Sequence, residues 1–154
     1  MPITVEQDNL SRAEVCAMIE AHVTELRGAS PPGESFALAL DGLRVPEITV
    51  WTAWDGANLC GCGAMKQLNG AEGELKSMRT HAKHLRRGVA QLLLSHIINI
   101  ARQRGYKKLL LETGTGAAFA AATQLYVRNG FNICDAFGDY APSEFSVFMV
   151  LDLR

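Results

Sequence analysis

Residues 83–90 of the chain read Lys83-His84-Leu85-Arg86-Arg87-Gly88-Val89-Ala90. Apolar residues recur every three or four positions after Gly88, which predicts a helix over about residues 88–104. No Ser, Thr, Asp or Asn stands directly before Gly88 to cap the first helical amides, and two arginines stand there instead. An uncapped helix start with a glycine and local positive charge is typical of a backbone cradle for a pyrophosphate.

Other interpretations of this loop stay open at the level of its own residues. The loop also fits a solvated basic turn beside an ordinary helix start. A dinucleotide-binding fold competes because Glu112 ends the next predicted strand, but Leu93 stands where the third glycine of that fingerprint belongs. A Walker-type loop is excluded, since the sequence contains no Gly-Lys-Ser or Gly-Lys-Thr.

The sequence on either side of the loop predicts a change from strands to alternating helices and strands. Branched and aromatic runs separated by Asp55-Gly56 and Asn69-Gly70 indicate an antiparallel meander before the loop. Helices between the later strands then predict an α/β (α+β) chain with a mixed sheet and helices on both faces. The predicted strands are 3–5, 48–54, 59–67, 74–79, 108–112, 131–134 and 146–151. The predicted helices are 12–27, 88–104 and 117–129, and residues 34–43 fit either a loop or a short helix.

The composition is that of an ordinary globular chain. Of its 154 residues 48% are hydrophobic and 20% charged, which predicts a single domain over residues 1–154. The formal net charge of -1 argues against bulk electrostatic binding of nucleic acid or of an anionic membrane. No apolar run approaches the roughly 20 residues that span a bilayer, and no secretion signal begins the chain, so a cytoplasmic protein is expected. The four cysteines follow no zinc spacing, and no metal site is predicted.

Four motifs, in order and at compatible spacings, resemble the GNAT superfamily of N-acetyltransferases. They are Glu74-Leu75-Lys76-Ser77-Met78-Arg79-Thr80, Arg86-Arg87-Gly88-Val89-Ala90, Leu109-Leu110-Leu111-Glu112-Thr113-Gly114 and Leu125-Tyr126-Val127-Arg128-Asn129-Gly130-Phe131. The resemblance covers residues 45–154, whereas the first third fits only the expected strand-helix-helix order. The end of the chain, with Phe137-Gly138-Asp139-Tyr140 and Ser146-Val147-Phe148-Met149, is similar to an uncharacterised bacterial branch of that superfamily.

The resemblance implies a single GNAT-like domain whose central sheet is mixed and mostly antiparallel. One parallel strand pair is implied to splay apart and to expose backbone groups toward the pantetheine arm of acetyl-coenzyme A. Met78 and Thr80 are implied to supply those groups, and an amide near Met78 would face the oxygen on which charge develops. No metal is implied.

The resemblance also implies which residues bind the cofactor. The pyrophosphate is assigned to the loop and the first turn of the helix. Leu85 departs from the family, which usually has Arg or Gln three residues before the glycine, and this bears on cofactor affinity. The full expected set is Met78, Arg79, Thr80, Leu85, Arg86, Arg87, Gly88, Val89, Ala90, Thr113 and Tyr126.

Two residues are implied to be catalytic. Tyr126 occupies the position of the family's frequent general acid, which would protonate the departing thiolate. A tyrosine on an amphipathic helix is otherwise a core residue with its hydroxyl at the edge. Glu74 is the expected base, acting through water, and its alternative is a surface carboxylate paired with Lys76.

The acceptor is expected to be a small amine or an amino-acid-like molecule. Ser35, Asp139 and Tyr140 are the candidate acceptor-binding residues, although Asp139 and Tyr140 also fit a purely structural turn. A homodimer is implied by the family.

The function expected from these residues is acetyl transfer from acetyl-coenzyme A to an amine. A module that binds or senses coenzyme A without transfer remains as an alternative, although it needs neither Tyr126 nor Glu74. A nucleotide-binding protein would instead prefer NAD or ATP over acetyl-coenzyme A.

Overall fold

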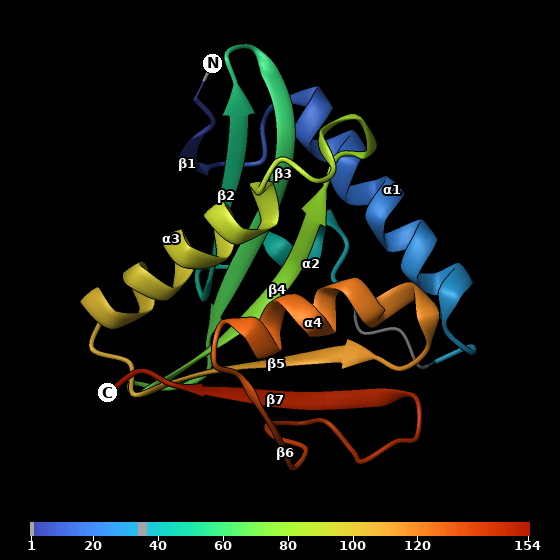
Figure 1. Cartoon of the computed structure of the whole chain (residues 1–154), viewed down its shortest axis with the longest axis vertical. Coiled ribbons are helices and arrows are strands. Elements are labelled where there is room, and N and C mark those ends of the chain that lie inside the picture. The colour runs from blue at the N-terminus through green and yellow to red at the C-terminus, as the bar shows by residue number, and fades with distance from the viewer. Residues whose placement is uncertain (1, 34–36) are drawn as a thin grey trace.

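A computed structural model describes residues 2–33 and 37–154, and its elements follow the predicted order (Figure 1). The strands are β1 (Thr4–Asp8), β2 (Ile48–Asp55), β3 (Asn58–Gln67), β4 (Glu72–Thr80), β5 (Lys108–Gly114), β6 (Asn132–Cys134) and β7 (Ser146–Asp152). The helices are α1 (Ala13–Ala29), α2 (Leu40–Leu43), α3 (Val89–Gln103) and α4 (Ala120–Arg128), and short 3-10 turns lie at Ala82–His84 and Ala117–Phe119.

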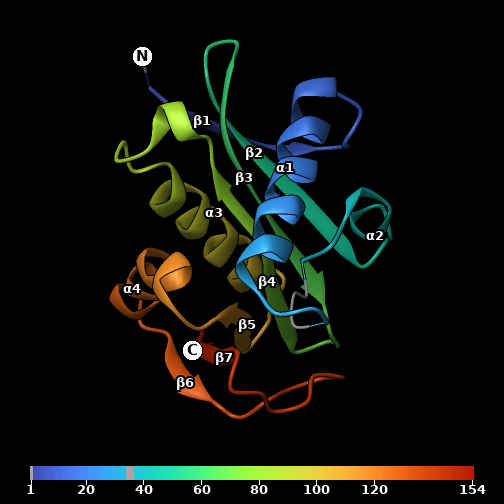
Figure 2. The same ribbon diagram turned by 90° about the vertical axis from the view of Figure 1, so that its right-hand side faces the viewer.

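The strands form one seven-stranded sheet in the order β1-β2-β3-β4-β5-β7-β6. Only the β4–β5 pair is parallel, and the other neighbouring pairs are antiparallel. Helices α3 and α4 lie on one face of the sheet and α1 and α2 on the other (Figure 2). The predicted mixed sheet with helices on both faces is therefore confirmed.

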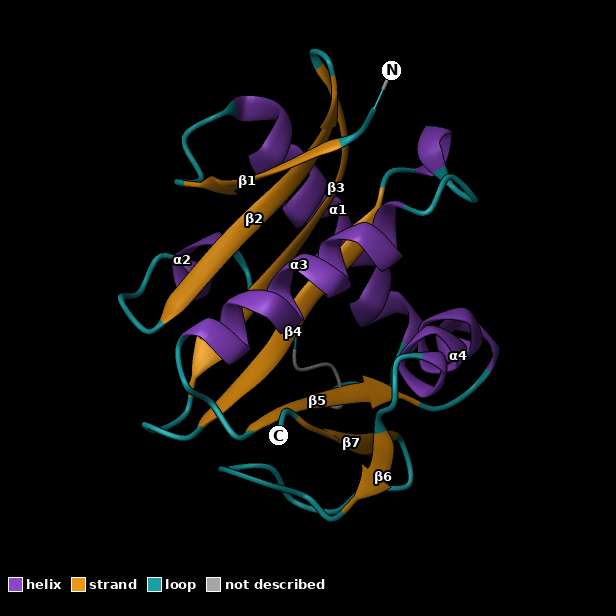
Figure 3. Cartoon of the chain, turned by 60° about the vertical axis from the view of Figure 1, so that its left-hand side comes forward, coloured by secondary structure: helices purple, strands orange, loops and turns teal. Residues whose placement is uncertain are grey.

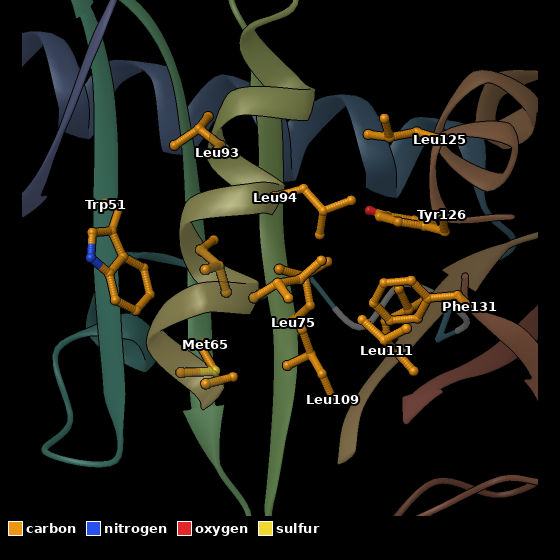
Figure 4. Close-up of a cluster of buried hydrophobic side chains, with 14 of the residues drawn as sticks. Trp51, Met65, Leu75, Leu93, Leu94, Leu109, Leu111, Leu125, Tyr126 and Phe131 are labelled. Carbon is orange, nitrogen blue, oxygen red and sulfur yellow. The ribbon is translucent and has the colours of Figure 1, made fainter. Parts of the chain in front are cut away.

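Helix α3 is built around an apolar stripe that packs on the sheet. A cluster of buried side chains joins this stripe to β4, β5 and α4, and Figure 4 shows Leu93 and Leu94 of α3 beside it. The sequence spacing placed Leu92 in the stripe, but this side chain is 38% exposed, whereas Leu94 is fully buried. The buried residues of α3 are Val89, Leu93, Leu94, Ile97, Ile98 and Ala101.

A second apolar cluster joins α1 and α2 to the opposite face of the sheet. Val15, Met18 and Ile19 of α1 pack there with Trp54 of β2 and Leu43 of α2. The sheet is thus packed between two separate apolar cores, one on each face. The burial of apolar area in both cores stabilises this arrangement.

Strands β4 and β5 separate after four paired residues. Parallel pairing runs from Glu72 opposite Lys108 to Leu75 opposite Leu111 and then stops, although both strands continue. Figures 1 and 3 show the two strands diverging toward their C-terminal ends. The splayed parallel pair implied by the resemblance is present, and it leaves one edge of β4 without a partner strand.

A bulge in β4 lies at the start of this free edge. Ala64 of β3 is opposite Lys76 and Cys62 is opposite Arg79, so Ser77 and Met78 together face the single residue Gly63. Ser77 has a φ of 57°, which is unusual for a residue with a side chain. A Cβ at Gly63 would lie 2.6 Å from the sulfur of Met78, so any larger residue there would displace the Met78 side chain.

Candidate active site

The gap between β4 and β5 opens into a cleft of about 930 Å³. Its walls come from α1 on one face of the sheet and from the start of α3 and from α4 on the other face. The cleft therefore has walls on both faces of the sheet, around the same splayed strands. Clefts of this size hold small molecules and cofactors.

The start of α3 forms one end of the cleft. Gly88 is the N-terminal cap residue with a φ of 78°, and no side chain hydrogen-bonds to cap the helix. Arg86, with a φ of 63°, lines the cleft together with Gly88, Val89 and Ala90. Free helical amides and an arginine thus face the same space, which is an arrangement that binds anions.

Unlike Arg86, Arg87 does not line the cleft. Its guanidinium donates to Asp55 at 3.0 Å and lies 2.7 Å from Nδ1 of His84, and its side chain does not line the cleft. The sequence placed Arg87 among the cofactor-binding residues, largely through backbone amides, and that placement stays a prediction. The ion pair with Asp55, at the end of β2, could not be foreseen from local spacing. The anchored Arg87 side chain ties the loop to the end of β2.

The unpaired edge of β4 supplies backbone groups. The amide of His81 donates to the carbonyl of Cys60 on β3 at 2.7 Å. Because alternate residues of a strand direct their backbone groups to opposite sides, Thr80 directs its own toward the open edge, as does Met78 two residues earlier. Both residues line the cleft, as do the remaining expected cofactor residues Arg79, Leu85 and Thr113.

Tyr126 lines the cleft from α4 but is only 7% exposed. Its ring packs against Phe131, with the ring centres 5.7 Å apart, and Figure 4 shows its hydroxyl directed toward Leu94 of α3. Burial raises the pKa of this phenol to about 12, so it keeps its proton at neutral pH. Tyr126 is thus a core residue that also lines the cleft and carries a protonated hydroxyl, and its role as a general acid stays a prediction.

Glu74, Lys76 and Tyr140 form a closed triangle of hydrogen bonds. The Glu74 carboxylate accepts from the Tyr140 hydroxyl at 2.6 Å and from the Lys76 ammonium at 3.1 Å, and Lys76 also donates to the Tyr140 oxygen at 3.0 Å. Glu74 is only 3% exposed, so the expected pairing with Lys76 exists but is buried. The Tyr140 pKa is raised by burial and by Glu74.

Only Lys76 of this triangle lines the cleft. Glu74 and Tyr140 do not line it; Glu74 was expected to act through water and Tyr140 to bind the acceptor, and both roles stay predictions. Asp139 is exposed and does not line the cleft either, and Ser35 lies outside the described residues. The carboxylate that does line the cleft is Glu112, which accepts from the Ser146 hydroxyl at 2.8 Å.

Sequence reasoning missed two further polar groups in the wall. His22 of α1 and Ser77 of β4 line the cleft, and Nδ1 of His22 and Oγ of Ser77 are buried without a hydrogen-bond partner. His22 lies among apolar residues of a predicted helix and Ser77 lies within a predicted strand, so neither carries a local signal of a site. Buried polar groups without partners are uncommon in folded proteins, so their presence in a cleft wall points to a ligand.

The neutral state of His22 predicts a pH dependence of stability. Burial, and secondarily Arg79, lowers its pKa from 6.5 to about 4. Between these values the unfolded chain binds more protons, so the contribution is complete above pH 6.5 and is lost as pH falls toward 4. Lowering the pH from 7 to 5 should cost the wild type about 2 kcal/mol more unfolding free energy than the His22→Gln variant.

Urea unfolding of both proteins at pH 7 and pH 5 measures this difference. Parallel losses in the two proteins would show that His22 is not buried in its neutral form.

Two kinds of feature are absent from the described residues. No helix in residues 2–33 and 37–154 is long and apolar enough to cross a membrane. Within the same ranges, no group of three or more His, Cys, Asp or Glu side chains is placed to hold a metal ion.

Comparison with known proteins places this geometry in a family. The model of the acetyltransferase (GNAT) family matches residues 15–131, which include the cleft-lining parts of α1, β4, α3, β5 and α4. The chain belongs to the GNAT family. Over 149 residues it is 47% identical to the uncharacterized N-acetyltransferase YsnE of Bacillus subtilis, covering 97% of this chain and 99% of YsnE. Over 150 residues it is 45% identical to the uncharacterized N-acetyltransferase YedL of Escherichia coli, covering 97% and 94%.

Solved structures agree with this GNAT assignment. A Klebsiella pneumoniae protein assigned as an acyl-CoA N-acyltransferase has a TM-score of 0.83 and 28% identity, covering 99% of this chain and 98% of that one. A GNAT acetyltransferase from Elizabethkingia anophelis, solved with acetyl-CoA bound, has a TM-score of 0.68 and 17% identity, covering 97% of each chain. The second likeness shows the GNAT fold alone. The family match and the two relatives named as N-acetyltransferases show that the chain is an N-acetyltransferase.

Proposed function

We propose that this N-acetyltransferase transfers the acetyl group of acetyl-coenzyme A directly to the primary amine of a small-molecule or amino-acid-like acceptor. The main support for this proposal is the cleft, whose walls lie on both faces of the sheet around the splayed strands. Acetyl-coenzyme A enters on the α3–α4 face and the acceptor on the α1 face. The two meet at β4, where proximity alone lowers the barrier to transfer.

The wall on the α3–α4 face fits acetyl-coenzyme A. The uncapped amides after Gly88 and the side chain of Arg86 suit its pyrophosphate. The free edge of β4 suits its amide-bearing arm, because unpaired strand groups bind extended chains by main-chain hydrogen bonds. Leu85, which is 58% exposed, adds apolar contact but no charge, so Arg86 is the charged group of this loop that meets the phosphates.

The cleft also favours direct transfer over an acyl-enzyme route. None of the described residues that line it is a cysteine. The nearest buried thiol by position in the sheet, that of Cys62, donates to the carbonyl of Ser77, and burial raises its pKa to about 12. A thiol that stays protonated is a weak nucleophile, so the amine itself attacks the thioester.

Proton transfers are assigned to groups at the cleft wall. Tyr126, protonated at neutral pH, donates to the departing thiolate. Amides of the free β4 edge near Met78 stabilise the charge that develops on the carbonyl oxygen. Glu74 reaches the acceptor only through Lys76 or water, whereas Glu112 lines the cleft directly. Glu112 is therefore the better-placed proton acceptor, and Glu74 holds Lys76 in position.

The remaining features of the proposal follow from the sequence and the family. Residues 1–154 act as one acetyltransferase domain, located in the cytoplasm. Two copies associate as a homodimer.

Calorimetric titration with acetyl-coenzyme A, NAD and ATP tests the cofactor assignment. Acetyl-coenzyme A should bind in the micromolar range while NAD and ATP bind far more weakly. A screen of acetyl-coenzyme A consumption over amino acids, polyamines, aminoglycosides and peptides then tests transfer. Preference for NAD or ATP, or binding without consumption by any amine, would contradict the proposed function.

A further inference from the structure

The acceptor side of the cleft is rich in hydrogen-bond donors. The α1 and β4 wall contributes an ammonium, a hydroxyl, a guanidinium and an imidazole, from Lys76, Ser77, Arg79 and His22. All four belong to the same continuous cleft. They are separated from the α3 start by the splayed strands, so they face the second substrate rather than the pyrophosphate.

The carboxylates of this wall are already occupied by its cations. Glu25 of α1 forms a two-pronged ion pair with the Arg79 guanidinium, one of whose contacts is 2.7 Å. Glu74 accepts from both Lys76 and Tyr140. Neither carboxylate is left to recognise the ammonium of an acceptor at this wall. Each instead fixes the position of a cation beside the cleft, and fixed cations recognise anions at little conformational cost.

Two neutral groups of the wall can donate hydrogen bonds to a ligand. Oγ of Ser77 is buried and has no partner. Nδ1 of His22 is in the same condition, and the low pKa of His22 keeps its ring neutral. Because an enclosed N–H without an acceptor is rarer than an enclosed lone pair, the proton belongs on Nε2. His22 then donates to the ligand from Nε2, and Ser77 donates from its hydroxyl.

We infer that this wall, formed by Lys76, Ser77 and His22, binds a carboxylate of the acceptor. The acceptor is then an amine that also carries a carboxylate, as an amino acid does. This inference rests on the proposed function, since it names the substrate class for the same cleft. A carboxylate accepts several hydrogen bonds at once and matches donors of mixed charge, whereas a polyamine is itself a set of donors and finds no matching acceptors in these groups.

Matched acceptor pairs test the inference on the unmodified enzyme. Each of the common amino acids is compared with its carboxamide, which has the same amine and side chain but no negative charge. The best amino acid acceptor should lose roughly 30-fold in kcat/KM as its carboxamide, because charge-assisted hydrogen bonds are lost. Carboxamides or polyamines acetylated as efficiently as the free acids would overturn the inference.

A variant that removes the charge of Lys76 tests whether this residue causes the preference for the free acid. Lys76→Met should lower kcat/KM for the amino acid by roughly 30-fold while changing that for the carboxamide by less than about 3-fold. Lys107→Met removes an exposed lysine outside the cleft and should leave both values unchanged. Equal losses for acid and carboxamide in Lys76→Met would assign Lys76 a structural role and refute the carboxylate site.

A binding measurement separates this inference from the proposed function. Calorimetry of the enzyme saturated with coenzyme A should show tighter binding of the amino acids than of their carboxamides, whether or not transfer occurs. Absence of acetylation with that preference intact would defeat only the proposed function. Equal binding of acid and carboxamide would defeat the carboxylate site.

Discussion

Replacing Gly88 with glutamate is expected to raise the KM for acetyl-coenzyme A by at least about 100-fold. Gly88 has a φ of 78° and stands at the uncapped start of α3, beside the cleft-lining Arg86. A glutamate there would place a carboxylate where the pyrophosphate binds and would compete for the same free amides. Steady-state kinetics with varied acetyl-coenzyme A, and calorimetry of its binding, measure the effect.

The control for this variant is Gly105→Glu. Gly105 lies just past the end of α3 with a φ of 80°, and an added Cβ would meet nothing within 4 Å at either glycine. Both variants therefore introduce similar backbone strain, about 1–2 kcal/mol each, and the same charge change. Only the Gly88 variant should affect acetyl-coenzyme A. Equal kinetic losses in both, or unchanged affinity in Gly88→Glu, would refute a pyrophosphate cradle at α3.

Tyr126→Phe is expected to lower kcat by about 100-fold while leaving the affinity for acetyl-coenzyme A nearly intact. The variant removes one hydroxyl and keeps the ring that packs against Phe131. Because burial raises the pKa of Tyr126 to about 12, the wild-type phenol stays protonated, and it should cause no fall in rate up to pH 10. Single-turnover rates and pH profiles check both statements.

A second tyrosine in the same core provides the comparison. Tyr106 is also 7% exposed, but it does not line the cleft. Tyr106→Phe should therefore preserve kcat. Its change in unfolding free energy measures the cost of losing a buried hydroxyl. Turnover that is unchanged in Tyr126→Phe would make Tyr126 a packing residue alone.

The features that the sequence predicted depend on short-range patterns. The loop before α3 was recognisable because Gly88 and the missing cap lie within a few residues of each other. The mixed sheet followed from strand spacing before the loop and helix spacing after it. The splay of β4 and β5 came only from the resemblance, since no residue pattern within either strand states where parallel pairing stops.

The features that were missed depend on long-range contacts. Arg87 is held by Asp55, and Glu74 is held by Tyr140, which is 66 positions away in sequence. The burial of His22 is likewise set by how α1 packs on the sheet. Leu92 shows that local patterns also have a limit. Because α3 contains three consecutive leucines, their spacing alone does not decide which of them face the sheet.

The bulge at Ser77 decides which side chains of β4 share a wall. In a regular strand, side chains alternate strictly, so Lys76 and Arg79 would point to opposite faces of the sheet. The extra residue shifts the phase of that alternation by one position. Leu75 and Met78 consequently both pack toward α3, while Arg79 meets Glu25 on the α1 side, the same face as Lys76. A β4 of the same sequence without the bulge would exchange Met78 and Arg79 between the two faces, whereas deleting Ser77 would remove the bulge and leave both side chains on their present faces.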